Sequence, residues 1–87
     1  MATLINNIIQ KMELKDFIEN FADQFDDTDA SEFKAETIFR DVDEWSSLNA
    51  LSVIAMVDEE YDVTLKGDDI QNSKTIEGLF NLVKSRM

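Results

Sequence analysis

The sequence predicts an all-α domain with three principal helices, one short helix and a long first connection. Apolar residues recur at the spacing of amphipathic helices, whereas strand-like alternation is weak. The chain of 87 residues is long enough for one core but not for two. Hydrophobic residues make up 44% of it, which favours a globular fold despite the many charges. No internal repeat or low-complexity segment divides the chain.

Two apolar stripes lie near the N-terminus. Leu14, Phe17, Ile18, Phe21 and Phe25 share one helical face and predict a first core helix over residues 14–25. The stripe over residues 2–12 points roughly 150° away, so one straight helix cannot bury both. We interpret residues 1–12 as an N-terminal extension or extra helical segment, docked separately or contributing to self-association, and residues 13–87 as the domain.

A long acidic connection follows, over residues 26–46. A structureless stretch of this length is unusual inside a compact domain unless it is functional or held in place. The side chains expected to hold it against the core are Phe33, Ile38, Phe39, Val42 and Trp45.

The second half of the chain contains the remaining helices. The first runs from Ser47 to about Tyr61, and we expect its core face to be Ala50, Ile54, Val57 and Tyr61, with Leu51 at the margin. The stretch Gly67-Asp68-Asp69-Ile70 predicts a single turn. The last helix runs from about Thr75 to Lys84, with an inner face of Ile76, Leu79, Phe80 and Val83.

Composition excludes several classes of function. A formal net charge of −11 disfavours nucleic acids and anionic membrane surfaces and favours partners with basic surfaces. Histidine and cysteine are absent, which removes the Ser-His and Cys-His nucleophiles and the usual zinc ligands. We therefore expect neither a self-sufficient hydrolase nor a zinc site. The lack of cysteine fits a cytoplasmic location, and no segment reaches the length or shows the features of a membrane span or signal peptide.

Two adjacent serines, Ser46 and Ser47, precede the most hydrophobic helix. One of them is explained as an N-cap. The other is a candidate for a phosphate ester, because an anion on a first-turn serine lies near the positive end of the helix dipole and unpaired backbone N–H groups. Leu48 and Ala55 lie away from the expected core face, near Ser52 and Glu59. Either Leu48 folds back on the preceding loop, or these residues form a docking ridge for a basic partner.

The run "EWSSLNALSVIAMVDEEYDV", with "KTIEGLF" beyond it, resembles the acyl carrier protein family. Members of that family are acidic four-helix bundles in which the serine of an Asp-Ser-Leu motif opens the second helix and is esterified by 4′-phosphopantetheine. Here the motif is Ser46-Ser47-Leu48, so the resemblance places the attachment at Ser47. It covers about residues 12–87. Ser46 replaces the family's aspartate, and Asn49 and Ser52 stand where acidic residues often contact partner enzymes.

The resemblance implies a discrete carrier that is not an enzyme. A phosphopantetheinyl transferase would load Ser47 from coenzyme A, and acyl-transferring and chain-elongating enzymes with basic surfaces would then use the carrier, most commonly in fatty acid biosynthesis. Polyketide, aminoacyl or other specialised cargo is the alternative, and we expect a monomer. The residues implied in partner docking are Leu48, Ser52, Ala55, Asp58, Glu59 and Asp62.

Two rival interpretations belong to other classes of protein. The acidic run "DDTDASEFKAE" suggests a calcium loop that begins at Asp27, but its sixth position is Glu32 instead of glycine and its twelfth is Ile38 instead of glutamate. The second rival is a helical adaptor that uses the same acidic ridge without a prosthetic group.

Overall fold

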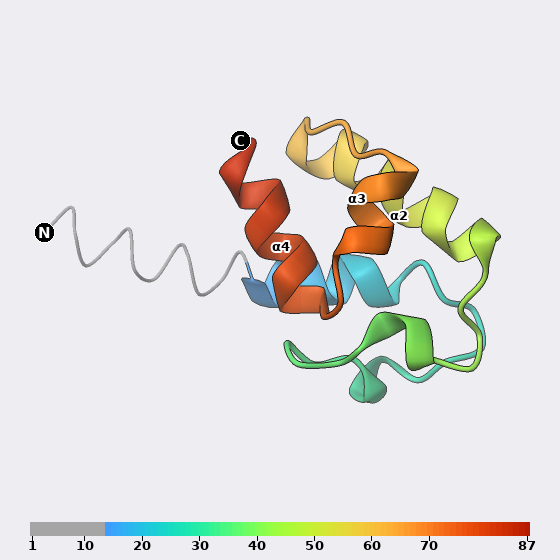
Figure 1. The fold of residues 1–87 in the computed structure, drawn as a ribbon. Coiled ribbons are helices and arrows are strands. Elements are labelled where there is room, and N and C mark those ends of the chain that lie inside the picture. The colour runs from blue at the N-terminus through green and yellow to red at the C-terminus, as the bar shows by residue number, and fades with distance from the viewer. Residues whose placement is uncertain (1–13) are drawn as a thin grey trace, which may run out of the picture.

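Four α-helices and two short 3₁₀ turns make up the fold of residues 14–87, the part of the chain that the computed structural model describes (Figure 1). The first helix runs over residues 14–22. The later elements are η1 (Ala30–Glu32), η2 (Phe39–Asp41), α2 (Ser47–Tyr61), α3 (Gly67–Asn72) and α4 (Ile76–Ser85). These residues form no β-strand, which confirms the predicted all-α class. The expected extension over residues 1–12 lies outside the described residues.

The first helix ends three residues earlier than predicted. The N–H of Gln24 donates to the carbonyl of Phe21 at 3.1 Å, and the N–H of Phe25 donates to that of Ala22 at 3.0 Å. These are bonds between residues three apart, so the last turn tightens and the α-helix stops. Phe17, Phe21 and Phe25 are nevertheless all buried. The predicted apolar face is therefore correct, although the boundary was not.

The long connection is held to the core by its aromatic side chains, as predicted. Phe33 and Phe39 are buried, and Ile38, Val42 and Trp45 are partly buried. Neighbouring rings in this region have centroids 4.8–6.4 Å apart, a range that favours tilted and offset packing. The rings that pack together are Phe21, Phe25, Phe33, Phe39 and Trp45. In Figure 1 the connection crosses the lower side of the helices.

Backbone groups also tie the connection to the last two helices. The carbonyl of Thr37 accepts the N–H of Ile76 at 3.2 Å, and the carbonyl of Ala35 accepts the N–H of Glu77 at 2.9 Å. The Arg40 guanidinium donates to two carbonyls at the end of α3, 3.0 and 3.1 Å away. Groups that a helix end leaves unpaired thus find partners in the connection.

The predicted core face of α2 was partly wrong. Val53 and Val57 are completely buried and Met56 almost so, whereas Ala50, Ile54 and Tyr61 pack at the edge of the core. Leu51, expected at the core margin, is 63% exposed. Apolar residues surround this helix between positions 48 and 57, so periodicity alone cannot select the arc that turns inward.

The last two helices follow the prediction closely. Helix α3 extends beyond the single turn expected, and α4 begins and ends one residue later than predicted. Asp69 of α3 and Arg86, just beyond α4, form an ion pair at 2.7 Å. The predicted inner face of α4 is buried in full. No helix within residues 14–87 combines the length and the apolar composition needed to cross a membrane.

Candidate functional site

The two serines before the apolar helix have different roles at the start of α2. Ser46 is the N-cap, with an extended backbone, and Ser47 is the first helical residue. The Ser46 hydroxyl donates to Oδ1 of Asn49 at 2.8 Å and accepts a long hydrogen bond from the Asn49 N–H at 3.5 Å. Capping therefore occupies the hydroxyl of Ser46.

Ser47 is exposed, and its hydroxyl has no hydrogen-bond partner among residues 14–87. As the first two helical residues, Ser47 and Leu48 have N–H groups that no carbonyl of the helix can accept. The first turn of α2 contains no acidic residue. An anion attached at Ser47 would thus meet the positive end of the helix dipole without a carboxylate beside it in that turn.

Asn49 and Glu44 fasten this helix start to the segment that follows the first helix. The buried amide of Asn49 donates to the carbonyl of Gln24 at 3.2 Å. The Glu44 carboxylate accepts the N–H groups of Asp26 and Asp27 at 2.8 and 2.9 Å, and the Thr28 hydroxyl at 2.8 Å. Desolvation raises the pKa of Glu44, but these hydrogen bonds outweigh it and hold the pKa below its ordinary value.

Neither role was predicted from the sequence. The resemblance marks Asn49 only as a departure from an acidic position, and it gives Glu44 no role. An asparagine at the third helical position after a serine cap is a weak local signal. Glu44 carries no local signal at all, because its partners lie 16–18 residues earlier in the chain.

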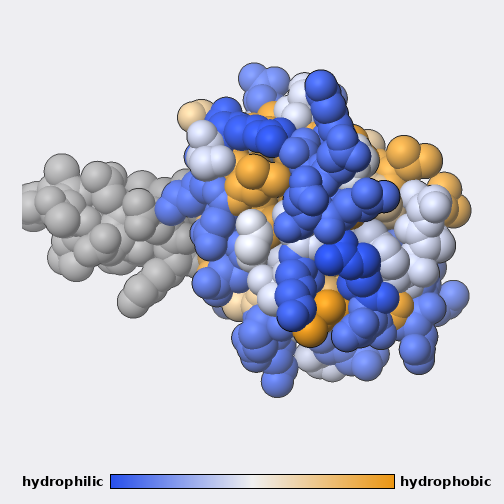
Figure 2. All heavy atoms as spheres, viewed as in Figure 1, coloured by the Kyte–Doolittle hydropathy of each residue, from blue (hydrophilic) through white to orange (hydrophobic). Residues whose placement is uncertain are grey.

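The outer face of α2 brings together the residues predicted for docking. Leu48 is 74% exposed, so it does not fold back on the loop. Ala55, Asp58, Glu59 and Asp62 are exposed and Ser52 is half-buried. Leu51 joins Leu48 on this face, and in Figure 2 hydrophobic atoms gather at the right-hand edge, over the start of α2. We call Leu48, Leu51, Ser52, Ala55, Asp58, Glu59 and Asp62 the docking face.

Charge on the docking face is confined to the end of α2. Asp62 is the C-cap, in the left-handed region with φ 55°, and its N–H donates to the carbonyl of Asp58 at 3.1 Å. No basic residue lies in the last turn. Carboxylates near the negative end of a helix dipole are destabilising. Neutral residues near Ser47 and carboxylates at the far end thus divide the face into two halves.

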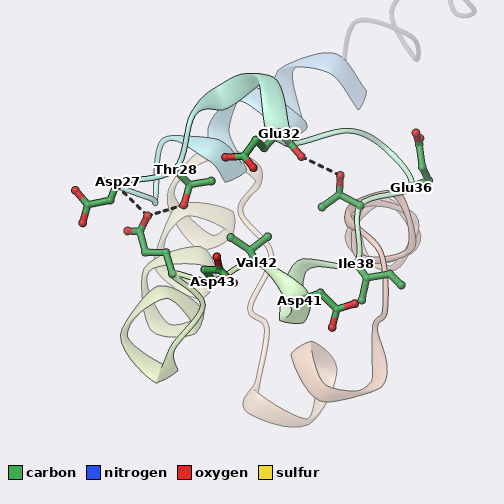
Figure 3. Close-up of a pocket in the computed structure, with 10 residues that line it drawn as sticks. Asp27, Thr28, Glu32, Glu36, Ile38, Asp41, Val42 and Asp43 are labelled. Carbon is green, nitrogen blue, oxygen red and sulfur yellow. Dashed lines mark hydrogen bonds between the residues drawn. The ribbon is translucent and has the colours of Figure 1, made fainter.

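Among the described residues a hollow lies beside the long connection and not at Ser47. It has a volume of about 700 Å³, and carboxylates predominate among the residues that line it (Figure 3). Within residues 14–87 no three acidic side chains are grouped as metal ligands. The Asp29 carboxylate, the third position of the calcium loop considered from the sequence, accepts the N–H of Ser31 at 2.9 Å, which lowers its pKa.

Comparisons with known proteins add no relative: no family model matches the chain, and neither the curated proteins nor the solved structures contain a significant match.

Proposed function

We propose that this protein is a discrete acyl carrier protein that is modified at Ser47 by 4′-phosphopantetheine. A phosphopantetheinyl transferase loads the group from coenzyme A, and the chain is the substrate of that reaction, not an enzyme. The bound group supplies a terminal thiol that holds acyl intermediates as thioesters. The proposed cargo is a fatty acyl chain in fatty acid biosynthesis, and the proposed location is the cytoplasm.

A difference between the two hydroxyls carries this proposal. Ser46 uses its hydroxyl to cap α2, whereas Ser47 presents an exposed hydroxyl with no hydrogen-bond partner among the described residues. Ser46 stands where the family motif has an aspartate. The capping role of Ser46 explains why this chain has a second hydroxyl beside Ser47. Both serines are exposed, but only the Ser47 hydroxyl is without a hydrogen bond among the described residues.

The surroundings of Ser47 fit a phosphodiester. Its own N–H and that of Leu48 are free of intrahelical partners, and no carboxylate lies in the first turn. The chain contains no histidine or cysteine to activate the hydroxyl. In the proposed reaction the transferase provides that activation, with its Mg²⁺, so the missing base is expected.

The docking face fits partners that have an apolar patch beside a basic one. Leu48 and Leu51 expose hydrophobic side chains one and four residues after Ser47. Asp58, Glu59 and Asp62 place negative charge at the helix end where it costs stability, and a basic partner would neutralise it. The separation of the two halves implies that partners contact apolar groups near the serine and pair charges farther along α2.

The fold agrees with this proposal at the level of its helices. The described residues form four helices, and the second of them begins at Ser47, as the resemblance to acyl carrier proteins implies. The finer assignment to an acyl-carrier-like bundle is part of the proposal. A monomer is the proposed state.

Intact-mass measurement after incubation with coenzyme A and a broad-specificity transferase tests the assignment. We expect the wild type to gain one phosphopantetheine, the Ser46→Ala variant to gain it as well, and the Ser47→Ala variant to gain none. Circular dichroism should show that all three proteins are folded. Modification that survives in Ser47→Ala and disappears in Ser46→Ala would move the site to the other hydroxyl.

The same experiment separates the alternatives. A polyketide, aminoacyl or other specialised carrier would also be loaded at Ser47, and differs in the acyl group found on protein isolated from its host. One observation, the exposure of Leu48 and Leu51, also favours an adaptor that uses the docking face without a prosthetic group. It predicts that no transferase modifies either serine.

A further inference from the structure

Residues on both sides of Ser47 are bonded to one short segment, residues 24–28. Three residues before Ser47, the Glu44 carboxylate accepts two backbone N–H groups and the Thr28 hydroxyl, all at 2.8–2.9 Å. Figure 3 draws the bonds that Asp27 and Thr28 donate. Two residues after Ser47, the Asn49 amide donates to the carbonyl of Gln24 at 3.2 Å. Ser47 has no bond of its own to this segment, and the contacts on both sides of it link the start of α2 to residues 24–28.

The chemistry of the Glu44 site requires a carboxylate. Three donors converge on two oxygens, and an ionised carboxylate has enough lone pairs and no hydrogen of its own. A glutamine of the same shape would turn an NH₂ group toward at least one donor. The side chain is half-buried and turned toward the protein, unlike the neighbouring exposed carboxylate of Asp43. Glu44 therefore has an internal role that the other acidic residues near Ser47 lack.

We propose that Glu44 is a positioning residue for the modification of Ser47. By fastening the segment before α2 to residues 26–28, it holds the helix start in one orientation and presents the serine hydroxyl to a transferase. Reactions between positioned groups are sensitive to displacements of about 1 Å. This inference rests on the proposed function, but it assigns to Glu44 a role separate from docking, because the residue does not belong to the docking face.

Transferase kinetics with the carrier as the varied substrate test this role. We expect Glu44→Ala to lower kcat at least about tenfold, Glu44→Gln to lower it less, and KM to change little, because the docking face is intact. Asp43→Ala is the matched control, since it removes the same charge one residue away and Asp43 makes no hydrogen bond within residues 14–87. Its kinetics should equal those of the wild type.

Comparing the changes in kcat and KM distinguishes a positioning role of Glu44 from an effect on the stability of the carrier. Partial unfolding lowers the concentration of folded carrier, so it raises the apparent KM and leaves kcat unchanged. Thr28→Val removes only one of the bonds to Glu44 and should lower kcat by a smaller factor in a folded protein. An unchanged kcat in Glu44→Ala, or an increase in KM alone, would overturn the inference while the proposed function stands. A wild type that no transferase loads would overturn both.

Discussion

The starts of α2 and α4 have the same kind of N-cap but differ in how many of their first N–H groups are hydrogen-bonded. Each has a hydroxyl N-cap, Ser46 in one case and Thr75 in the other. At α4 the first three N–H groups all have partners: carbonyls of the long connection accept the first two, and the Thr75 hydroxyl accepts the third at 3.0 Å. At α2 only the third is bonded among the described residues, through the long contact to Ser46.

This difference shows how the fold can close one helix start and leave another open. The connection covers the start of α4, where Ile76 is completely buried. It leaves the start of α2 uncovered, so Ser47 and Leu48 are exposed. The unpaired N–H groups of an exposed helix start are bonded by water or by a ligand. An open start, braced from behind by Glu44 and Asn49, is suited to accept an external group.

The two helix starts should differ most in the loss of stability when the first apolar residue of each is truncated. Ile76→Ala at the closed start should lower the free energy of unfolding by about 2–5 kcal/mol, because it leaves a cavity in the core. Leu48→Ala at the open start should change it by less than about 0.5 kcal/mol, yet raise the KM of the transferase. Urea denaturation measures the first quantity for both variants. Equal losses of stability would mean that the α2 start is also packed in solution.

A smaller effect is expected from removing the caps. Thr75→Ala should lower the free energy of unfolding by about 1 kcal/mol, the usual contribution of a hydroxyl cap. Ser46→Ala should cost more, because the carbonyl of the buried Asn49 amide also loses the donor at 2.8 Å. Thermal or urea unfolding of the two variants, with Ser47→Ala as the control that leaves both caps in place, tests this order. A larger loss in Ser47→Ala than in Ser46→Ala would reverse the assignment of the cap.

The smallest effect concerns pH and the carboxylate that ties α3 to the end of α4. The hydrogen bond from Arg86, with one from the Lys66 N–H, lowers the pKa of Asp69 from 3.8 to about 2. Because the folded-state pKa is the lower one, the contribution to stability is present above about pH 4 and disappears as the pH falls toward 2. The site is near the surface, so added salt should weaken the effect.

Urea midpoints measured between about pH 5 and about pH 2, a range that includes the Asp69 transition, test this expectation. Asp69→Asn should flatten part of the decline seen in the wild type. Asp68→Asn, which alters the adjacent exposed carboxylate, should leave the decline unchanged. A decline that is identical in all three proteins would show that the ion pair at 2.7 Å does not contribute measurably.

Local spacing predicted most of the fold correctly. The bounds of α2 and, within one residue, those of α4 follow from apolar periodicity, as do the aromatic residues that hold the connection. The buried face of α2 was not predicted correctly from spacing, because apolar residues lie on all sides of this helix between positions 48 and 57. The end of the first helix was not predicted correctly either, because its last turn tightens while the Phe25 side chain is still buried in the core.

The sequence by itself determined the helices, the acidic surface and the presence of two hydroxyls at one helix start, because these depend on residue types and on spacing within a few turns. Only the tertiary structure decided which hydroxyl serves as the cap, that Leu51 faces outward and that Glu44 faces inward. These properties depend on contacts such as that of Asn49 with Gln24, 25 residues earlier. Such contacts arise when the helices pack, and no local pattern encodes them.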